Sequence, residues 1–389
     1  MSIDMGIGVS SEADVYAAGQ QAARQVVAHL GGARPDLTLV FASLRFADPR
    51  MLRGVRSITD NARLIGCTDA GGIGTPGSFR RSVTVIGLKG KNGARFVVSL
   101  GRDLSKALEA TTDEVCAVFQ ASDRQEAKAL LVFPDGLTVS GSDLLRRLQS
   151  RLGRVPIVGG SAADDFLFQR TFQFFDEQIL TDSIPAALLC GDIAVGVGVY
   201  HGWVPLGRPR RVTKAIGNTV YQLDQRPAIS IYEDYLGGRR EEWTEDPLAQ
   251  MAMTYPLGVL IPGETEYLLR DALRLGPDGA LICTADLPEG SEVRLMIGEQ
   301  ESALEAARHA ARQAIEHLGE VHLKGALVFC SVARQKVLGG EYHGEVDVIR
   351  DALGGSGVRL GGFYTYGEHA PVSGENRFHN ESVVVMAMG

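Results

Sequence analysis

Apolar residues recur along this chain in short continuous runs that alternate with longer stretches of helical spacing. Residues 37–44 form a nearly continuous apolar run, which is typical of a buried strand. Residues 13–30 repeat apolar side chains at helical intervals, and Gly31, Gly32 and Pro35 then supply a helix stop signal. The same reasoning predicts a strand at 95–100 and helices at 103–122, 142–152 and 301–318. Such alternation of strands and helices predicts α/β layering.

Three stretches of the chain follow one plan: an apolar strand, a helical stretch, a Gly-rich second strand and a further apolar strand. The first strands read LTLVFASLRF, ALLVFPDGL and GALVFCSVAR, and the Gly-rich strands read RLIGCTDAGGIG, PIVGGSAADDF and VRLGGFYTYGEHA. The spacing between the two strands can be measured from a valine of the first to a glycine of the second, which gives the pairs Val40 and Gly66, Val132 and Gly159, and Val328 and Gly361. Because these spacings are long and unequal, they favour duplicated subdomains over a solenoid of fixed period.

The length of 389 residues exceeds one typical core, so two domains are predicted, with a boundary near 207–211 where the second repeated unit ends. The predicted domains are 1–207 and 208–389. The predicted fold class is α/β, with two halves, mixed β-sheets in layers, helices on the outer faces and internally repeated strand-helix-strand-strand units.

Composition narrows the classes of function. The net charge of −8 comes from dispersed acidic residues, so sequence-independent binding of nucleic acid is not expected. No apolar run approaches the roughly 18 to 20 residues that cross a bilayer, and the first residues lack a signal-peptide pattern. We therefore expect a cytoplasmic protein without a membrane partner. The five cysteines are scattered without a CxxC pair, which fits neither a disulfide framework nor a zinc site.

Polar chemistry is densest at residues 361–380, which read GGFYTYGEHAPVSGENRFHN. A ligand with a carboxylate and an ammonium group needs a cation for the first and carboxylates for the second. Arg270 and Arg334 are the candidate cations; the alternative for each is a structural ion pair at a strand end. The candidate anions and other ligand-binding residues are Thr68, Gly159, Gly160, Ser161, Asp164, Asp165, Tyr364, Tyr366, Glu368, His379 and Asn380.

These candidates have structural alternatives. The glycines Gly159 and Gly160 would let backbone N–H groups face a ligand, while Asp164 and Asp165 fit a turn between strands equally well. Alternating tyrosines line pockets or fill cores. The predicted site is a cleft between the two halves, where 361–380 meets the Gly-rich turn at 159–165, and ligand binding would favour a closed arrangement of the halves.

The combined segments resemble one known family. RLIGCTDAGGIG and PIVGGSAADDF look like the N-terminal half of FIST domain proteins, and HGWVPLG looks like the junction. YLLRD, LPEGSEVRLM, ALVFCSVAR and GGFYTYGE followed by FHN look like the C-terminal half. The resemblance covers nearly the whole chain. It implies a stand-alone sensory module that binds small ligands such as amino acids and signals to a separate output protein, for example a histidine kinase or a diguanylate cyclase. A homo-oligomer is also possible.

Some members of that family look like haem proteins that sense nitric oxide. The resemblance therefore implies an alternative cofactor, a non-covalent haem held by His201 or His379, since no CxxCH attachment site exists. If haem does not bind, no cofactor or metal is expected.

Two other classes of function, an enzyme and a scaffold protein, remain alternatives to the sensor. Ser161, Thr68 and Cys330 can each be nominated as a nucleophile next to a Gly-rich turn. None lies in a GxSxG elbow, and no metalloprotease motif is present, so the sequence predicts no enzyme activity. A short nucleophile–base contact in the cleft would favour a hydrolase. A filled centre with a broad apolar patch would favour a scaffold.

Overall fold

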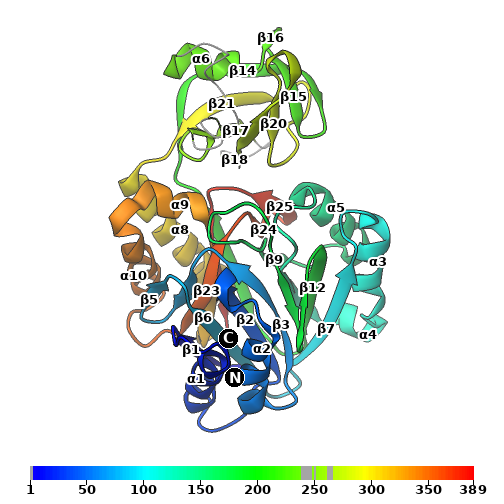
Figure 1. The fold of residues 1–389 in the computed structure, drawn as a ribbon, viewed down its shortest axis with the longest axis vertical. Coiled ribbons are helices and arrows are strands. Elements are labelled where there is room, and N and C mark those ends of the chain that lie inside the picture. The colour runs from blue at the N-terminus through cyan, green and yellow to red at the C-terminus, as the bar shows by residue number, and fades with distance from the viewer. Residues whose placement is uncertain (1–2, 238–247, 249–250, 261–265) are drawn as a thin grey trace.

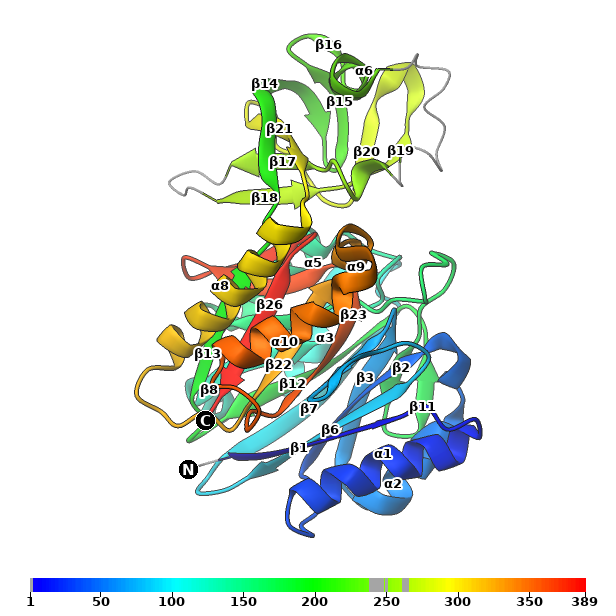
Figure 2. The same ribbon diagram turned by 90° about the vertical axis from the view of Figure 1, so that its left-hand side faces the viewer.

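The computed structural model describes residues 3–237, 248, 251–260 and 266–389. It shows a large body of three mixed sheets, with a small β-rich insertion above it (Figure 1). The insertion leaves the body after strand β13 (Val195–Tyr200) and returns at helix α8 (Gln300–Leu318). The predicted α/β class, with helices on the outer faces of mixed sheets, is confirmed (Figure 2).

The three body sheets have the same strand order. Each contains an edge strand, the last strand of a repeated unit, its first and second strands, and then a two-stranded hairpin. The first and second strands pair in parallel and the last strand is antiparallel to the first. The predicted repetition of strand-helix-strand-strand units is therefore confirmed three times over.

The bounds of the repeated units follow the apolar patterns. The first contains β2 (Leu37–Ser43), α2 (Pro49–Thr59), β3 (Arg63–Asp69), β4 (Gly72–Gly74), β5 (Gly77–Phe79) and β6 (Val83–Gly90). The second contains β8 (Ala127–Val132), α5 (Gly141–Leu152), β9 (Ile157–Gly160), β10 (Gln173–Phe175), β11 (Gln178–Leu180) and β12 (Ser183–Cys190). The third contains β22 (Gly325–Ser331), α9 (Val332–Leu338), α10 (Tyr342–Ala352), β23 (Leu360–Thr365), β24 (Glu368–Val372), β25 (Glu375–His379) and β26 (Val383–Met388).

The hairpins are exchanged between units. The β4–β5 hairpin of the first unit pairs with β23 of the third, β10–β11 of the second pairs with β3 of the first, and β24–β25 of the third pairs with β9 of the second. Each sheet is thus completed by the next unit, which closes a ring of three. Because of this exchange, the strands near the C-terminus, β22 to β26, lie in sheets that also contain strands from β1 to β13, so the two ends of the body cannot be separated.

A cluster of phenylalanines fills the centre of this ring. Phe41, Phe133 and Phe329 follow the equivalent valines of the three first strands, and their rings lie 5.0 to 6.4 Å apart between centroids. Phe363 stacks on Phe41 at 4.3 Å. All four side chains are fully buried, so the middle of the body is core and not a channel.

One glycine in each second strand permits the close approach of the first strand. Gly66, Gly159 and Gly362 pair with Val40, Val132 and Val328, and a Cβ at these positions would lie 1.8, 2.1 and 1.7 Å from the valine carbonyl oxygen. The residue equivalent to Gly66 is therefore Gly362, not Gly361. Because successive residues of a strand face opposite sides of the sheet, Gly361 and Gly362 lie on opposite faces of β23.

Two of the edge strands are covered by their own helices in the same way. Strand β1 (Ile3–Ser10) has helix α1 (Val15–His29), and β13 has α8. Gln25 accepts a hydrogen bond from Val9 N–H at 3.1 Å, as Gln313 does from Val199 N–H at 3.0 Å. His29 and His317 bond the carbonyl oxygens of Ile7 and Val197. These side chains satisfy groups that would otherwise template pairing with another chain. The third edge strand is β7 (Arg95–Arg102), followed by α3 (Leu108–Ala117) and α4 (Ala121–Gln125) in place of the single helix predicted at 103–122.

The insertion is one strongly bent antiparallel sheet with a helix on its outer side. Its elements are β14 (Val204–Ile216), β15 (Thr219–Leu223), β16 (Arg226–Pro227), α6 (Ser230–Leu236), β17 (Leu257–Leu260), β18 (Tyr267–Arg270), β19 (Ala272–Leu275), β20 (Leu281–Cys283) and β21 (Glu292–Ile297). The domain boundary predicted at 207–211 falls inside β14. In space the chain divides instead into the body and this insertion.

Candidate functional site

Two cavities lie where the insertion meets the body, one on each side of the β24–β25 hairpin. The first has a volume of about 610 Å³ and the second about 680 Å³, both within the range of small-molecule sites. Arg154 and Leu268 line both of them. The hairpin belongs to the polar 361–380 segment, so this segment does border the cavities.

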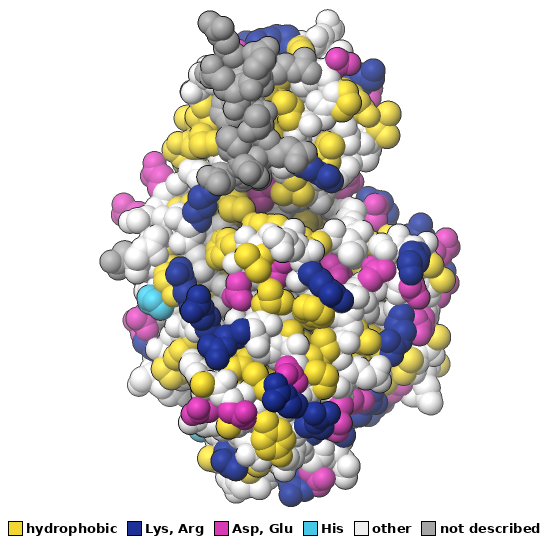
Figure 3. Space-filling model, viewed as in Figure 1, with side chains coloured by type: hydrophobic (Ala, Val, Ile, Leu, Met, Phe, Trp, Pro, Cys, Tyr) yellow, Lys and Arg dark blue, Asp and Glu magenta, His cyan; other side chains and the backbone are white. Residues whose placement is uncertain are grey.

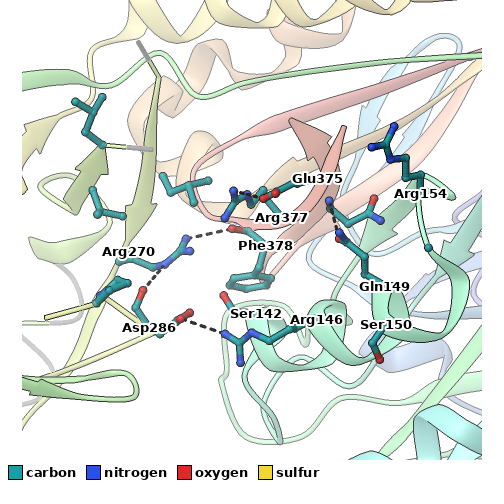
Figure 4. Close-up of a pocket in the computed structure, with 16 residues that line it drawn as sticks. Ser142, Arg146, Gln149, Ser150, Arg154, Arg270, Asp286, Glu375, Arg377 and Phe378 are labelled. Atoms are coloured by element: carbon teal, nitrogen blue, oxygen red, sulfur yellow. Dashed lines mark hydrogen bonds and ion pairs between the residues drawn. The ribbon is translucent and has the colours of Figure 1, made fainter. Parts of the chain in front are cut away.

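The first cavity carries charges of both signs from three different parts of the fold (Figure 4). The insertion contributes Arg270 and Asp286, helix α5 contributes Arg146, and strand β25 contributes Glu375 and Arg377. Arg146 bonds Asp286 across the gap at 3.2 Å, and Arg377 pairs with Glu375. The set thus offers both partners that a zwitterionic ligand needs.

Arg270 is the buried cation of this set. Its Nη1 donates to the carbonyl oxygens of Leu269 at 2.8 Å and Phe378 at 3.1 Å, and its Nε to that of Asp286 at 3.4 Å. Burial lowers its pKa to about 10, so the guanidinium stays charged at neutral pH. A buried cation that is bonded to carbonyl oxygens gains more from a nearby anion than an exposed one does. None of these bonds uses Nη2.

Fewer charged side chains line the second cavity, where Arg154 and Glu266 are joined by neutral polar and apolar residues. Val195, Val197 and Val199 of β13 form one wall, and His201 and His379 are its buried imidazoles. Burial lowers the pKa of His201 to about 4 and that of His379 to about 3, so both are neutral at physiological pH. His379 Nε2 lies 3.2 Å from the Ala370 carbonyl oxygen, whereas the described residues offer no hydrogen bond to His201 Nε2.

A buried carboxyl pair joins the insertion to the body beside these cavities. Asp271 follows β18 and Glu381 precedes β26, and the two carboxyls are close enough for the charge of Asp271 to raise the pKa of Glu381. Burial raises the pKa of Asp271 to about 6, and burial together with Asp271 raises that of Glu381 well above its ordinary range. The Glu381 oxygens have no hydrogen-bond partner among the described residues, so a proton on Glu381 relieves both its burial as an anion and its repulsion with Asp271.

This pair predicts a pH dependence. A carboxyl whose pKa is raised by folding contributes stability below its unfolded pKa of about 4, and this stability is lost as pH rises through its folded pKa. The contribution of this pair to thermal stability is therefore expected to be lost as pH rises from about 4 through the folded pKa of Asp271 at about 6 and beyond, and Glu381→Gln should remove this part of the slope because glutamine stays neutral. Thermal denaturation followed by circular dichroism at a series of pH values measures it.

The control is Asp192→Asn, which changes an exposed carboxylate of the body and should leave the slope unchanged. The buried histidines His201, His369 and His379 contribute the opposite trend, because they take up protons near pH 6.5 only in the unfolded chain, and this trend is the same in the wild type and in both variants. An unchanged slope in Glu381→Gln would contradict the assignment of a proton to Glu381.

Of the residues predicted from the sequence, the structure places Arg270 in the first cavity and His379 in the second. Asn380 is buried beside them, and its side-chain oxygen accepts a hydrogen bond from Thr284 at 2.8 Å. These three residues lie where the insertion meets the body, and not between the predicted halves 1–207 and 208–389.

The Gly-rich turn at 159–165 does meet the C-terminal segment, but the contact is packed. A Cβ on Gly160 would lie 2.3 Å from the Thr365 methyl group. Ser161 Oγ lies 3.2 Å from His369 Nε2, and both residues are buried. Burial lowers the pKa of His369 to about 3, and no described residue bonds its Nδ1. Thr68 bonds Phe172 N–H at 3.0 Å. The Ser161–His369 contact therefore lacks both a third, orienting group and an approach for substrate.

Asp164 and Asp165 organise the loop that follows them. The Asp164 carboxylate accepts three backbone N–H bonds and the Tyr366 hydroxyl, while Asp165 accepts Ser43 Oγ at 2.9 Å. Neither lines the two cavities.

Arg334, Tyr364 and Glu368 are internal. Arg334 bonds Glu345 at 2.6 Å and the carbonyl oxygens of His201, Glu381 and Ala303. Tyr364 Oη lies 3.5 Å from Glu345, and Glu368 accepts bonds from Thr365 and from Ser382 N–H. Burial raises the pKa of Glu368 well above its ordinary range. The role of Arg334 is thus the structural ion pair that the sequence left open.

The sequence analysis missed Arg146, Arg154 and Asp286. All three lie on polar stretches that look like solvated surface, with Arg146 and Arg154 in and just after helix α5 and Asp286 far from them in sequence. Only the exchange of the β24–β25 hairpin and the return of the insertion bring them to one cavity, so no local pattern could have identified them.

Comparison with known proteins gives two family matches and several relatives. The FIST N domain model matches residues 36–226 and the FIST C domain model matches residues 228–371. An uncharacterized protein of Mycobacterium tuberculosis is 26% identical over 382 residues, covering 96% of this chain and 97% of the relative. An uncharacterized protein of Mycobacterium bovis is 24% identical over 386 residues, covering 96% of each.

Among solved structures, a cyanuric acid hydrolase from A. caulinodans matches with a TM-score of 0.34 at 10% identity, covering 99% of each chain. A TM-score this low does not support a conclusion about the fold or the function of this chain. Within the described ranges, every helix is too short or too polar to traverse a bilayer. In the same ranges no group of three or more His, Cys, Asp or Glu side chains is arranged to hold a metal ion.

Proposed function

The chain belongs to the FIST family of sensory signal-transduction domains, and from this premise we propose that it binds a small zwitterionic metabolite, such as an amino acid, in the first cavity. The observation that carries the proposal is the mixed charge set of that cavity. Arg270 and Arg146 would hold the carboxylate, and Asp286 and Glu375 the ammonium group. The 610 Å³ volume leaves room for a side chain next to the apolar Val259 and Leu268.

The position of the cavity supports a sensory mechanism. Arg270 and Asp286 belong to the insertion, whereas Arg146 and Glu375 belong to the body. A ligand that contacts both sets binds more tightly to the arrangement in which they are close, so it shifts the population toward that arrangement. We propose that a separate output protein, such as a histidine kinase or a diguanylate cyclase, reads this change, and that the chain itself catalyses no reaction.

The proposal predicts a selective thermal shift. An amino acid or small carboxylate at about 100 times its Kd should add roughly 2.7 kcal/mol of stability. The double variant Arg146→Ala/Arg154→Ala should weaken binding about tenfold to a hundredfold, because the carboxylate loses its bond to Arg146, which contributes about 1.5 to 3 kcal/mol, and Arg154 no longer adds positive charge to the cavity. Both side chains are exposed, so the variant should fold. Thermal shift across the amino acids, followed by calorimetric titration, measures this.

Arg53→Ala, on α2 and away from both cavities, is the matched control and should bind as the wild type does. If a confirmed ligand binds the double variant and the wild type equally, the first cavity is not its site.

A second candidate rests on His201. Its Nε2 is buried in the 680 Å³ cavity, has no hydrogen bond from the described residues and lies 3.8 Å from Glu266, so it fits an axial haem ligand better than His379 does. A bound haem iron would supply a site for a diatomic gas. Haemin therefore belongs in the same screen, and a Soret band that His201→Ala abolishes would select this candidate.

A further inference from the structure

One loop of the body, residues 165–170, is fixed in its conformation by hydrogen bonds and by a contact between two aromatic rings. The 165–170 loop is part of the connection between β9 and β10, and Asp164 just before it accepts hydrogen bonds from the N–H groups of Phe168, Gln169 and Arg170, each at 2.8 Å. The ring of Phe168 stacks on Tyr366 at 4.3 Å with an interplanar angle of 11°. The Asp164 carboxylate, through its three hydrogen bonds to the backbone, and the stacked ring of Phe168 together hold the loop in one conformation.

That shape carries backbone strain. Asp165, Phe166 and Phe168 have φ values of 55°, 67° and 50°, in the left-handed region that bulky residues rarely adopt. A bulky residue in this region is strained, and strain of this kind persists where the surroundings enforce it, often at functional sites. The hydrophobic core does not require this conformation, because Phe166 and Phe168 are both partly exposed and neither is a buried core residue.

The loop displays apolar side chains instead of burying them. Phe166 is 37% exposed, Leu167 51% and Phe168 43%, and Leu137 of the neighbouring loop is 39% exposed. Gly136 N–H bonds Thr171 Oγ1 at 3.4 Å, which holds the two loops together. Hydrophobic side chains gather on this face of the body below the insertion (Figure 3). An exposed apolar patch on a rigid support is typical of a protein-binding surface.

Basic side chains border the patch. Arg170 ends the loop, and Arg45 follows Leu44, whose N–H bonds Asp165 at 3.2 Å. Arg81 precedes Ser82, whose carbonyl accepts from Ser43 N–H. All three arginines are exposed, and none forms an ion pair with the part of the chain that the structure describes. Figure 3 shows basic side chains among the hydrophobic ones on this face. On a chain with a net charge of −8, this is a local positive rim.

The patch is joined to the candidate ligand site by a short covalent path. Tyr366, which stacks on Phe168 and bonds Asp164, is two residues before Glu368, where β24 begins. The β24–β25 hairpin separates the two cavities and lines both. A displacement of the hairpin by ligand would therefore act directly on the ring that supports the loop.

We propose that the 165–170 loop with Leu137 docks an acidic, apolar segment of the signal-output protein. The apolar side chains would anchor the segment, and Arg45, Arg81 and Arg170 would select acidic residues around it. This inference rests on the proposed sensory function and names the surface through which the signal leaves.

The test uses a fluorescent synthetic peptide of alternating leucine and glutamate, with a leucine and lysine peptide as its charge-reversed counterpart. Anisotropy titration should show saturable binding of the acidic peptide and at least about tenfold weaker binding of the basic one. Leu167→Ser should weaken the acidic peptide about tenfold, as loss of an apolar anchor does. Arg170→Glu should abolish the preference for the acidic peptide.

Leu273→Ser on the insertion, an equally apolar position at 38% exposure, is the matched control and should bind as the wild type. Equal binding of the two peptides, no binding of either, or unchanged binding by Leu167→Ser would overturn the docking surface. Each variant is also tested for the amino-acid thermal shift. A retained ligand shift with lost peptide preference separates failure of docking from failure of the ligand site.

Discussion

Replacement of Arg334 by methionine is expected to lower the free energy of unfolding by about 3 to 5 kcal/mol, the cost of breaking a buried ion pair by removing one partner. Glu345 would be left charged and buried, and the carbonyl oxygens of His201, Glu381 and Ala303 would lose their donor. Chemical denaturation followed by circular dichroism measures the loss. If Arg334→Met is too unstable to purify, Glu345→Gln provides the milder test of the same pair.

The position of these carbonyls gives a second readout. His201 precedes the insertion and Ala303 lies in the first turns of α8 just after it, so Arg334 ties both connections of the insertion to the body. Limited proteolysis of Arg334→Met should therefore cut at the connections before it cuts the body.

The matched control for this variant is Arg312→Met on the exposed face of α8, with an expected change within about 0.5 kcal/mol. The double variant Arg334→Met/Glu345→Leu should recover part of the loss, because no charge remains buried, but the carbonyls stay unpaired. A stability of Arg334→Met within error of the control would show that the pair contributes nothing. Loss of ligand binding in Arg334→Met alone would not place Arg334 in the ligand site.

Arg334 and Arg270 show where sequence reasoning ends. Both follow apolar strand-like runs, and both were candidates to bind a carboxylate. What distinguishes them is Glu345 on α10, which pairs with Arg334, whereas Arg270 bonds only carbonyl oxygens beside a cavity. That difference depends on packing between elements that are distant in sequence, so the local pattern around either arginine could not reveal it.

The repeated units were predictable for the opposite reason. Each carries a continuous apolar first strand and a Gly-rich second strand, and these signals are local. The exchange of hairpins was not predictable, because β4, β10 and β24 pair with strands of another unit and look the same whichever sheet they join. The insertion was hidden as well, since its strands continue the apolar alternation of the body without a linker.

Replacement of Gly362 by alanine is expected to cost about 3 kcal/mol or more, because the new Cβ would lie 1.7 Å from the Val328 carbonyl oxygen and neither strand of this central pair can move freely. Gly361→Ala should cost less, about 1 to 2 kcal/mol, because its Cβ would meet the flexible end of Ile86 at 2.6 Å. Gly357→Ala, with open space around it, should be neutral or slightly stabilising. Thermal and chemical denaturation of the three variants gives the order.

This graded order tests the three-fold architecture and not merely one site. Gly66 and Gly159 face the equivalent carbonyl oxygens of Val40 and Val132 at 1.8 and 2.1 Å, so alanine there should be as costly as at position 362. If position 361 proved the more sensitive of the pair, the third unit would be shifted by one residue, and each side chain of β23 would face the opposite side of its sheet. Phe363 would then leave the central phenylalanine cluster, which its stacking on Phe41 at 4.3 Å excludes.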